Sequence, residues 1–275
     1  MDVELIKRVH EVNFDILSEI HRICKENNLC YFLDSGTLLG AVRHQDFIPW
    51  DDDLDIAVRR EDFPRFVEVM RRELDDRFEF VMPDSLNGNF YDFIPRVQLK
   101  HSQRRNPTEE DLYYDNKQNK LCSDVFILDK VPSSKMAQKM QVLWTKALYG
   151  MAMGHRYSVD YSKYTPGNRI LVAVLSRIGK CIKTEKIMRW QEKRARKYEN
   201  TDATCRMVLN YPLPFIHQIY EEIWFKETAS LPMHGGEFSG PKMYHEVLTS
   251  RYGDYMKLPP EDKRVPEHDI RELKY

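Results

Sequence analysis

Residues 47–58 read FIPWDDDLDIAV, a stretch in which four aspartates stand directly before an apolar run. Crowded carboxylates repel one another and lose hydration when they are buried, so they need either open water or a bound cation. The apolar residues need a core to pack against, and this packing fixes the direction in which the acids point. The stretch therefore predicts a half-buried strand with a carboxylate cluster at its start.

Side chains alternate between the two faces of a strand. If residues 51–58 are extended, Asp51, Asp53 and Asp55 project to one side, whereas Asp52 projects to the other. Two carboxylates on one face of a rigid strand can share a hard cation, and Mg²⁺ prefers such oxygen ligands while leaving positions for phosphate. A metal-binding pair at Asp53 and Asp55 is our interpretation, and a solvated acidic turn is the alternative.

Two further signals flank this stretch. Ser35, Gly36 and Thr37 lie between a predicted strand and a predicted helix. Backbone N–H groups and hydroxyls at such a junction can bind phosphate oxygens, although an ordinary helix cap uses the same residues. The third acid is Asp124, which stands among apolar residues in CSDVFIL (residues 122–128). An aspartate in a buried strand is costly unless it is paired or bound to metal.

The whole chain has the composition of a globular protein. Its 275 residues carry a formal net charge of −1, which gives no general attraction to nucleic acid. The start lacks the pattern of a secretory signal, and the longest apolar run, residues 170–175, is too short to cross a bilayer. The five cysteines are scattered without zinc-site spacing, so we expect reduced thiols and a cytoplasmic protein.

Apolar periodicity indicates a mixture of helices and strands, and therefore an α+β fold. Helical spacing predicts helices at residues 9–27, 63–74, 135–149, 168–179, 184–199 and 242–252. Short apolar runs predict strands at residues 30–33, 51–58, 78–81, 91–99 and 121–128, and a hairpin around residues 235–236.

The run FLDSGTLLGAVRHQDFIPWDDDLDIAV, residues 32–58, resembles the signature of the LicD family. These are phosphocholine transferases related to fukutin-type sugar-phosphate transferases, within the nucleotidyltransferase-fold superfamily. The superfamily pattern is a G-[ST] turn, a DxD strand and a third acid on a neighbouring strand. Residues 36–37, Asp53 with Asp55, and Asp124 match these positions. The segment 251–268 resembles the family's closing segment, which ends in a histidine, here His268.

The resemblance implies a nucleotidyltransferase-like mixed sheet flanked by helices, with an additional mainly helical segment. We expect the catalytic core to span residues 1–132. Residues 133–275, beyond the change in character at Pro132, would form the helical segment and a C-terminal part that completes the active-site cleft.

The resemblance also implies a reaction. A phospho-alcohol group, with phosphocholine favoured, would pass from a CDP-activated donor such as CDP-choline to a hydroxyl of a cell-surface glycan or lipid-linked glycan precursor, releasing CMP. The implied catalytic residues and ligands of Mg²⁺ or Mn²⁺ are Asp53, Asp55 and Asp124. The residues implied to contact the donor nucleotide and its phosphates are Ser35, Gly36, Thr37, Arg43 and His44.

Two other functions compete with this interpretation. A nucleotidyltransferase of the same fold would attach NMP from an NTP to a small hydroxylated molecule and release pyrophosphate. A catalytically inactive binding module would be expected to lack Asp53, Asp55 or Asp124, and all three are present.

Several other residues are candidates for substrate contact. A choline group would favour aromatic faces, because its quaternary ammonium donates no hydrogen bond. The candidates, each of which also fits an ordinary core position, are Trp50, Tyr91, Phe93 and Trp224. Arg96 and Lys100 are weaker candidates for phosphate contact.

The helical segment 177–197 carries nine Lys or Arg residues and two Glu, although the chain as a whole is almost neutral. This segment either contacts an anionic surface, such as the inner face of a membrane, or forms a solvated basic face.

Overall fold

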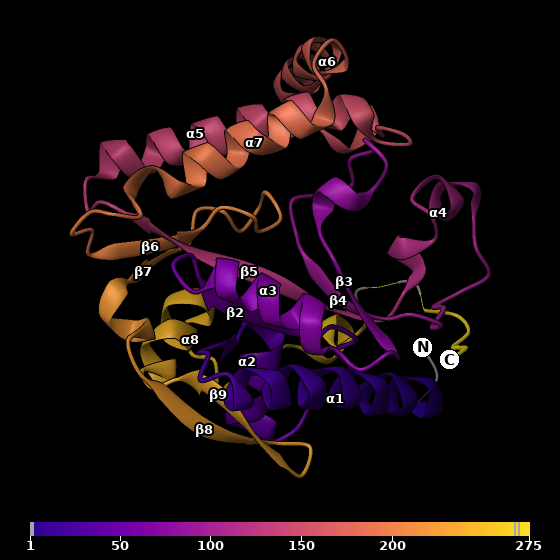
Figure 1. Ribbon diagram of the computed structural model, residues 1–275, viewed down its shortest axis with the longest axis vertical. Helices are drawn as coiled ribbons and strands as arrows, with labels where there is room; N and C mark the ends of the chain where they lie inside the picture. The colour runs from indigo at the N-terminus through magenta and orange to yellow at the C-terminus, as the bar shows by residue number, and fades with distance from the viewer. Residues whose placement is uncertain (1–2, 267, 269) are drawn as a thin grey trace.

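The computed structural model describes residues 3–266, 268 and 270–275, so Glu267 of the closing segment lies outside the described residues. A curled mixed sheet runs through the centre, with helices on both sides (Figure 1). Its strands are β1 (Phe32–Leu33), β2 (Asp55–Arg59), β3 (Phe78–Val81), β4 (Arg96–Leu99), β5 (Cys122–Val131), β6 (Cys205–Val208) and β7 (Ile219–Glu221). A separate hairpin consists of β8 (Thr228–Met233) and β9 (Gly236–Pro241).

The helices are α1 (Val3–Glu26), α2 (Ser35–His44), α3 (Phe63–Glu73), α4 (Glu109–Tyr113), α5 (Lys135–Ala152), α6 (Pro166–Lys180), α7 (Thr184–Ala195) and α8 (Tyr244–Tyr252). The predicted α+β class, with a mixed sheet flanked by helices, is confirmed. The mainly helical stretch is also present, as α5, α6 and α7.

Strand β5 is the centre of the sheet, because it pairs with three other strands. It runs parallel to β2 along one edge, and antiparallel to β4 and then β6 along the other. The remaining order is β1 beside β2 and β3 beside β4. Most of β5 is buried, as expected for a strand with a long apolar run and neighbours on both sides. The pairing of β5 with its neighbours therefore fixes which residues of β2 and β4 lie opposite β5 where these strands begin.

Helix α1 supplies much of the core beneath the sheet. Its apolar residues recur at intervals of three and four, so they form one stripe, and they are buried at Val9, Val12, Ile16, Ile20 and Ile23. The helix packs against α3 and the sheet. It ends near the predicted position, where Asn28 takes a left-handed conformation with φ of 51°.

Two predicted strands were too long, for identifiable reasons. The strand predicted at residues 51–58 begins only at Asp55, the residue at which its parallel pairing with β5 begins opposite Asp124. The strand predicted at residues 91–99 begins only after Pro95, which has no N–H to donate to a ladder.

The two halves of the chain contribute to one sheet. Strands β6 and β7 follow the helices in sequence and extend the sheet from β5. Helices α5 and α7 lie over this side of the sheet in Figure 1, and α6 lies farthest from α1. The division near residue 132 stays a prediction. Within residues 3–266, 268 and 270–275, no helix combines the length and apolar character needed to cross a membrane.

A buried ion pair joins the ends of β2 and β5 to α7. Arg60 and Asp129 are 1% and 0% exposed, and Arg60 Nε donates to Asp129 Oδ1 at 2.6 Å. The same guanidinium contacts Glu192 on α7 through Nη1 at 2.9 Å. Because both charges of the first pair are fully desolvated, each depends on the other for its stability.

We therefore expect Arg60→Leu to destabilise the protein by about 3–5 kcal/mol, since it leaves the Asp129 charge buried without its partner. The measurement is urea unfolding followed by circular dichroism. The double variant Arg60→Leu/Asp129→Leu should recover most of this loss, because no buried charge remains. A double variant as unstable as Arg60→Leu would contradict this account.

Candidate active site

A cavity of about 710 Å³ opens where β2, β4 and β5 begin. This volume is in the range of small-molecule sites. The predicted residues that line it are Ser35, Gly36, Arg43, Asp53, Asp55 and Asp124. Asp51 lines it as well and Asp52 does not, but the carboxylates of Asp52 and Asp53 both contact His268. The alternation predicted from residue 51 is therefore wrong for the residues before β2 begins at Asp55. Residues far apart in the sequence, including His268 near the end of the chain, therefore meet in one space.

The parallel register of β2 and β5 places Asp55 directly opposite Asp124. Opposite residues in neighbouring strands project to the same face, so the two carboxylates are cross-strand neighbours. Thr37 holds the start of β2, because its Oγ1 accepts the Asp55 backbone N–H at 2.9 Å. Burial, together with the negative charges of Asp53 and Asp124, raises the pKa of the Asp55 carboxyl well above its ordinary value. The two neighbouring carboxylates repel each other, and this repulsion destabilises the folded protein unless positive charges lie close to them.

Arg96 balances part of this charge from β4. It lies opposite Asp124 on the other edge of β5, and its Nε is 2.8 Å from Asp124 Oδ1. Its Nη2 is 2.6 Å from Asp92 Oδ2. Burial still raises the pKa of Asp124, although Arg96 opposes the rise. Arg96, proposed from the sequence as a phosphate contact, is thus held between two carboxylates, and Lys100 does not line the cavity.

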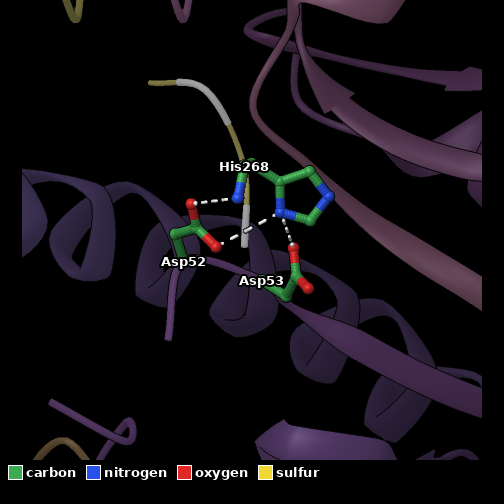
Figure 2. A group of neighbouring side chains, drawn as sticks. All are labelled: Asp52, Asp53 and His268. Carbon is green, nitrogen blue, oxygen red and sulfur yellow. Dashed lines mark hydrogen bonds and ion pairs between the residues drawn. The ribbon is translucent and has the colours of Figure 1, made fainter. Parts of the chain in front are cut away.

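Figure 2 shows a second balanced cluster, formed by Asp52, Asp53 and His268. His268 Nδ1 lies 2.9 Å from Asp53 Oδ1 and 3.2 Å from Asp52 Oδ1. The His268 backbone N–H also donates to Asp52 Oδ2 at 3.1 Å. These two carboxylates raise the pKa of His268 to about 10, so the imidazole is protonated at neutral pH. Asp52 is therefore a structural anchor for the C-terminal segment.

Candidate metal ligands form a slightly different set from the predicted one. Among the described residues, Asp52, Asp53 and His268 are the group of three whose potential ligand atoms all lie within 4.8 Å of one another. Asp55 and Asp124 line the same cavity but do not belong to this group. Ion pairs account for this difference between the two sets, because the Asp53 carboxylate contacts His268 whereas the Asp124 carboxylate contacts Arg96.

The start of α2 forms another wall of the cavity. Ser35 has a left-handed backbone with φ of 51°, which is unusual for a residue other than glycine. Asp34, which precedes it, accepts hydrogen bonds from Ser35 Oγ at 3.1 Å and from Tyr211 Oη. Arg251 Nη1 lies 3.8 Å from the same carboxylate. The strained turn is thus held by residues from α8 and from the segment after β6.

Gly36 is required at its position by close packing. A Cβ atom there would lie 2.2 Å from Asp51 Oδ2, far inside contact distance. Only a glycine therefore lets the Asp51 carboxylate lie against the first turn of α2. The predicted glycine–threonine turn has two physical uses, since Gly36 accommodates Asp51 and Thr37 binds the start of β2.

Arg43 and His44 lie at the end of α2. Arg43 lines the cavity, and it donates through Nη1 to the Tyr255 carbonyl at 2.9 Å and through Nε to His44 Nε2 at 3.0 Å. His44 and Thr37 contact neighbouring protein groups and do not line the cavity. The assignment of these residues to the donor stays a prediction.

The aromatic candidates divide into two groups. Trp50 and Tyr91 line the cavity. Phe93 and Trp224 do not, because Phe93 is buried against Phe90 and Trp224 packs beside Tyr220. These two residues therefore occupy packed positions outside this cavity.

Several cavity residues were not named as site candidates from the sequence, although four of them lie in the closing segment 251–268. They are Arg104, Lys117, Tyr211, Phe215, Arg251, Tyr252, Lys257 and Lys263. Most come from the second half of the chain, and they add positive charge beside the aspartates. A cavity with both carboxylates and cations fits a ligand that combines a metal ion with phosphates.

The residues present fit a divalent cation. The Asp55 carboxyl is buried beside other carboxylates, and the available donors are oxygens, which Mg²⁺ and Mn²⁺ favour. Asp53, Asp55 and Asp124 would hold the ion, and a neutral His268 offers one nitrogen ligand in addition.

Comparison with known proteins agrees with this geometry. Residues 28–143 match the model of the LicD/FKTN/FKRP nucleotidyltransferase domain. The chain is 28% identical to the lipopolysaccharide cholinephosphotransferase LicD of Haemophilus influenzae, over 94% of this chain and 93% of that protein. It is 31% identical to the human ribitol 5-phosphate transferase FKRP, over 37% of this chain and 23% of that protein. The chain is therefore similar to LicD-family proteins, and the match to the family domain covers residues 28–143.

Asp55→Asn should raise the melting temperature of the metal-free protein at pH 7. A raised pKa means that the folded chain binds the Asp55 proton more tightly than the unfolded chain does, so stability falls as the pH rises above about 4. Asparagine does not ionise, and each kcal/mol gained corresponds to roughly 2–4 °C. Calorimetry in EDTA should show a gain at pH 7 that disappears below about pH 4.

The exposed Asp76 offers a matched control, because Asp76→Asn changes the same charge away from the cavity and should leave the melting temperature unchanged. Added Mg²⁺ should stabilise the wild-type protein more than Asp55→Asn. A lower melting temperature for Asp55→Asn at pH 7, with an equal response to Mg²⁺, would contradict the carboxylate-cluster account.

Proposed function

We propose that this protein belongs to the LicD family and transfers a phospho-alcohol group from a CDP-activated donor to a hydroxyl of a cell-surface glycan or lipid-linked glycan. Phosphocholine is the favoured group, and lipopolysaccharide or teichoic acid precursors are the favoured acceptors. The observation that carries the proposal is the meeting of Asp53, Asp55 and Asp124 with several cations in one cavity. The relative from Haemophilus influenzae, whose name specifies cholinephosphotransfer, matches almost the whole chain and supports the choice of group.

The residues suit a reaction that depends on positioning and charge. Phosphoryl transfer places little covalent demand on the protein, and catalysis comes mainly from alignment and charge stabilisation. A bound Mg²⁺ or Mn²⁺ at Asp53 and Asp55 would neutralise the donor diphosphate. Arg43, Arg104 and Arg251 also line the cavity, and guanidinium groups bind phosphate oxygens through paired hydrogen bonds.

The bond changes follow from the chemistry of the donor. The acceptor hydroxyl oxygen attacks the phosphorus that carries the alcohol, and the bond from this phosphorus to the bridging diphosphate oxygen breaks to release CMP. The hydroxyl proton passes to a carboxylate. Asp124 is suited to accept it, because burial raises its pKa and so makes it a better base than an ordinary aspartate. Arg96 would keep this carboxylate oriented.

The five cysteines are free, including the buried Cys24. Free thiols are typical of reducing compartments, and this supports our placing the reaction in the cytoplasm, where CDP-activated donors would be available.

Incubation with Mg²⁺ and a series of CDP-alcohols should release CMP, as measured by mass spectrometry, with CDP-choline the fastest. Slow hydrolysis, with water as the acceptor, would be enough to identify the donor. Asp53→Asn and Asp124→Asn should lower the rate by roughly a thousandfold, because the first removes a residue that would hold the metal ion and the second removes the carboxylate that would accept the hydroxyl proton. Asp76→Asn serves again as the control.

Release of pyrophosphate from an NTP in the presence of a small hydroxylated acceptor, without CMP release from any CDP-alcohol, would refute the proposal. That result would instead favour a nucleotidyltransferase. Full CMP release by both aspartate variants would also refute it.

Gly36→Ala should slow CMP release by roughly a hundredfold, since an added Cβ displaces the Asp51 carboxylate from its place in the cavity. Gly167→Ala is a matched control, because a Cβ there meets nothing within 4 Å. Steady-state rates and melting temperatures should be measured together. An active Gly36→Ala enzyme with an unchanged melting temperature would show that the position of Asp51 is unimportant.

A further inference from the structure

Helix α6 exposes a continuous apolar stripe. The exposed fractions are 68% for Ile170, 53% for Leu171, 47% for Val174 and 48% for Ile178. These residues are spaced at one, four and eight positions from the first, so they share one face of the helix. None of them lines the cavity described above.

The orientation of this stripe is fixed by tight packing on the other face. Ser176 and Gly179 are buried, with Ser176 beside Gly154 just after α5, and a Cβ on Gly179 would lie 1.8 Å from the Met151 carbonyl oxygen of α5. Likewise, a Cβ on Gly150 would lie 2.7 Å from a methyl carbon of Leu175. Because the two backbones approach so closely, α6 cannot rotate to bury its stripe. The apolar face points away from the rest of the protein, and α6 lies at the outer limit of the molecule in Figure 1.

Positive charge accompanies the stripe. Helix α6 carries Arg169, Arg177 and Lys180 and contains no Asp or Glu, and Lys183 follows in the next turn. An apolar face with basic neighbours matches two features of an anionic lipid surface, since the acyl region accepts the apolar side chains and the headgroups attract the charges. A second copy of the chain is a poorer match, because a symmetric contact would bring the same cations together.

We propose that α6 binds the surface of an anionic lipid bilayer, with its exposed stripe inserted at the level of the headgroups. The docking surface consists of Ile170, Leu171, Val174 and Ile178 with Arg177 at its edge, and Lys180 adds positive charge at the end of the same helix. This inference does not depend on the identity of the donor or on the proposed reaction.

The test is co-sedimentation of the full chain with vesicles of phosphatidylcholine alone or of phosphatidylcholine mixed with phosphatidylglycerol. Wild-type protein should bind the anionic vesicles more tightly than the neutral ones. Binding should weaken when NaCl is raised from about 0.1 M, where the Debye length is about 10 Å, to about 0.5 M, where it is shorter. Ile170→Ser/Val174→Ser should weaken binding by about tenfold or more, because it removes inserted apolar surface. Arg177→Gln/Lys180→Gln should weaken it by about fivefold per charge.

Leu112→Ser is the matched control, since Leu112 is 64% exposed on α4 and lies outside the proposed surface. All variants change exposed side chains, so their melting temperatures should equal that of the wild type. Equal binding by wild type and Ile170→Ser/Val174→Ser, or no wild-type binding to anionic vesicles, would overturn the proposal. A dimer seen by light scattering that this double variant abolishes, without vesicle binding, would assign the stripe to a second copy instead.

Discussion

The side-by-side placement of Asp55 and Asp124 is the constraint on which the rest of the site depends. It follows from the parallel register of β2 and β5, and neither strand can shift without moving its apolar residues out of the core. Like charges in opposite positions oppose folding. The fold therefore holds two carboxylates in an unfavourable arrangement, and cations from elsewhere in the chain must compensate for it.

That compensation comes from two distant segments. Arg96 reaches Asp124 from β4, and His268 reaches Asp53 from the C-terminal segment. Each cation binds a second carboxylate as well, so acids still outnumber bases around β2. A local cluster of carboxylates at the start of β2 and β5 is the kind of oxygen-rich site in which a divalent ion binds well. The same charges that reduce stability in the empty protein thus create affinity for a metal ion bound to phosphate.

The fold and the site could be predicted from the sequence to different extents. The aspartates before an apolar run and the glycine–threonine turn are local patterns, so Asp53 and Asp55 could be placed in the cavity from them, although the alternation predicted before Asp55 was wrong. The pairing of Arg96 with Asp124 depends on the antiparallel register of β4, which no local pattern specifies. The contact of His268 with Asp53 depends on the path of the last residues across the sheet. The residue types could be read from the sequence, but the sequence did not indicate which distant residues would contact each other.

The origin of the compensating residues also connects folding with function. Asp34 at the strained turn is held by Tyr211 and Arg251, and both come from the second half of the chain. The aspartates belong to the first half, which alone would lack the contact of His268 with Asp53 and the side chains that hold the strained turn at Ser35. Strands β6 and β7 attach the second half to the same sheet. The contacts of Asp34 and Asp53 with distant residues therefore form only when both halves have folded together, so the cavity depends on the whole chain although its sequence signature is short.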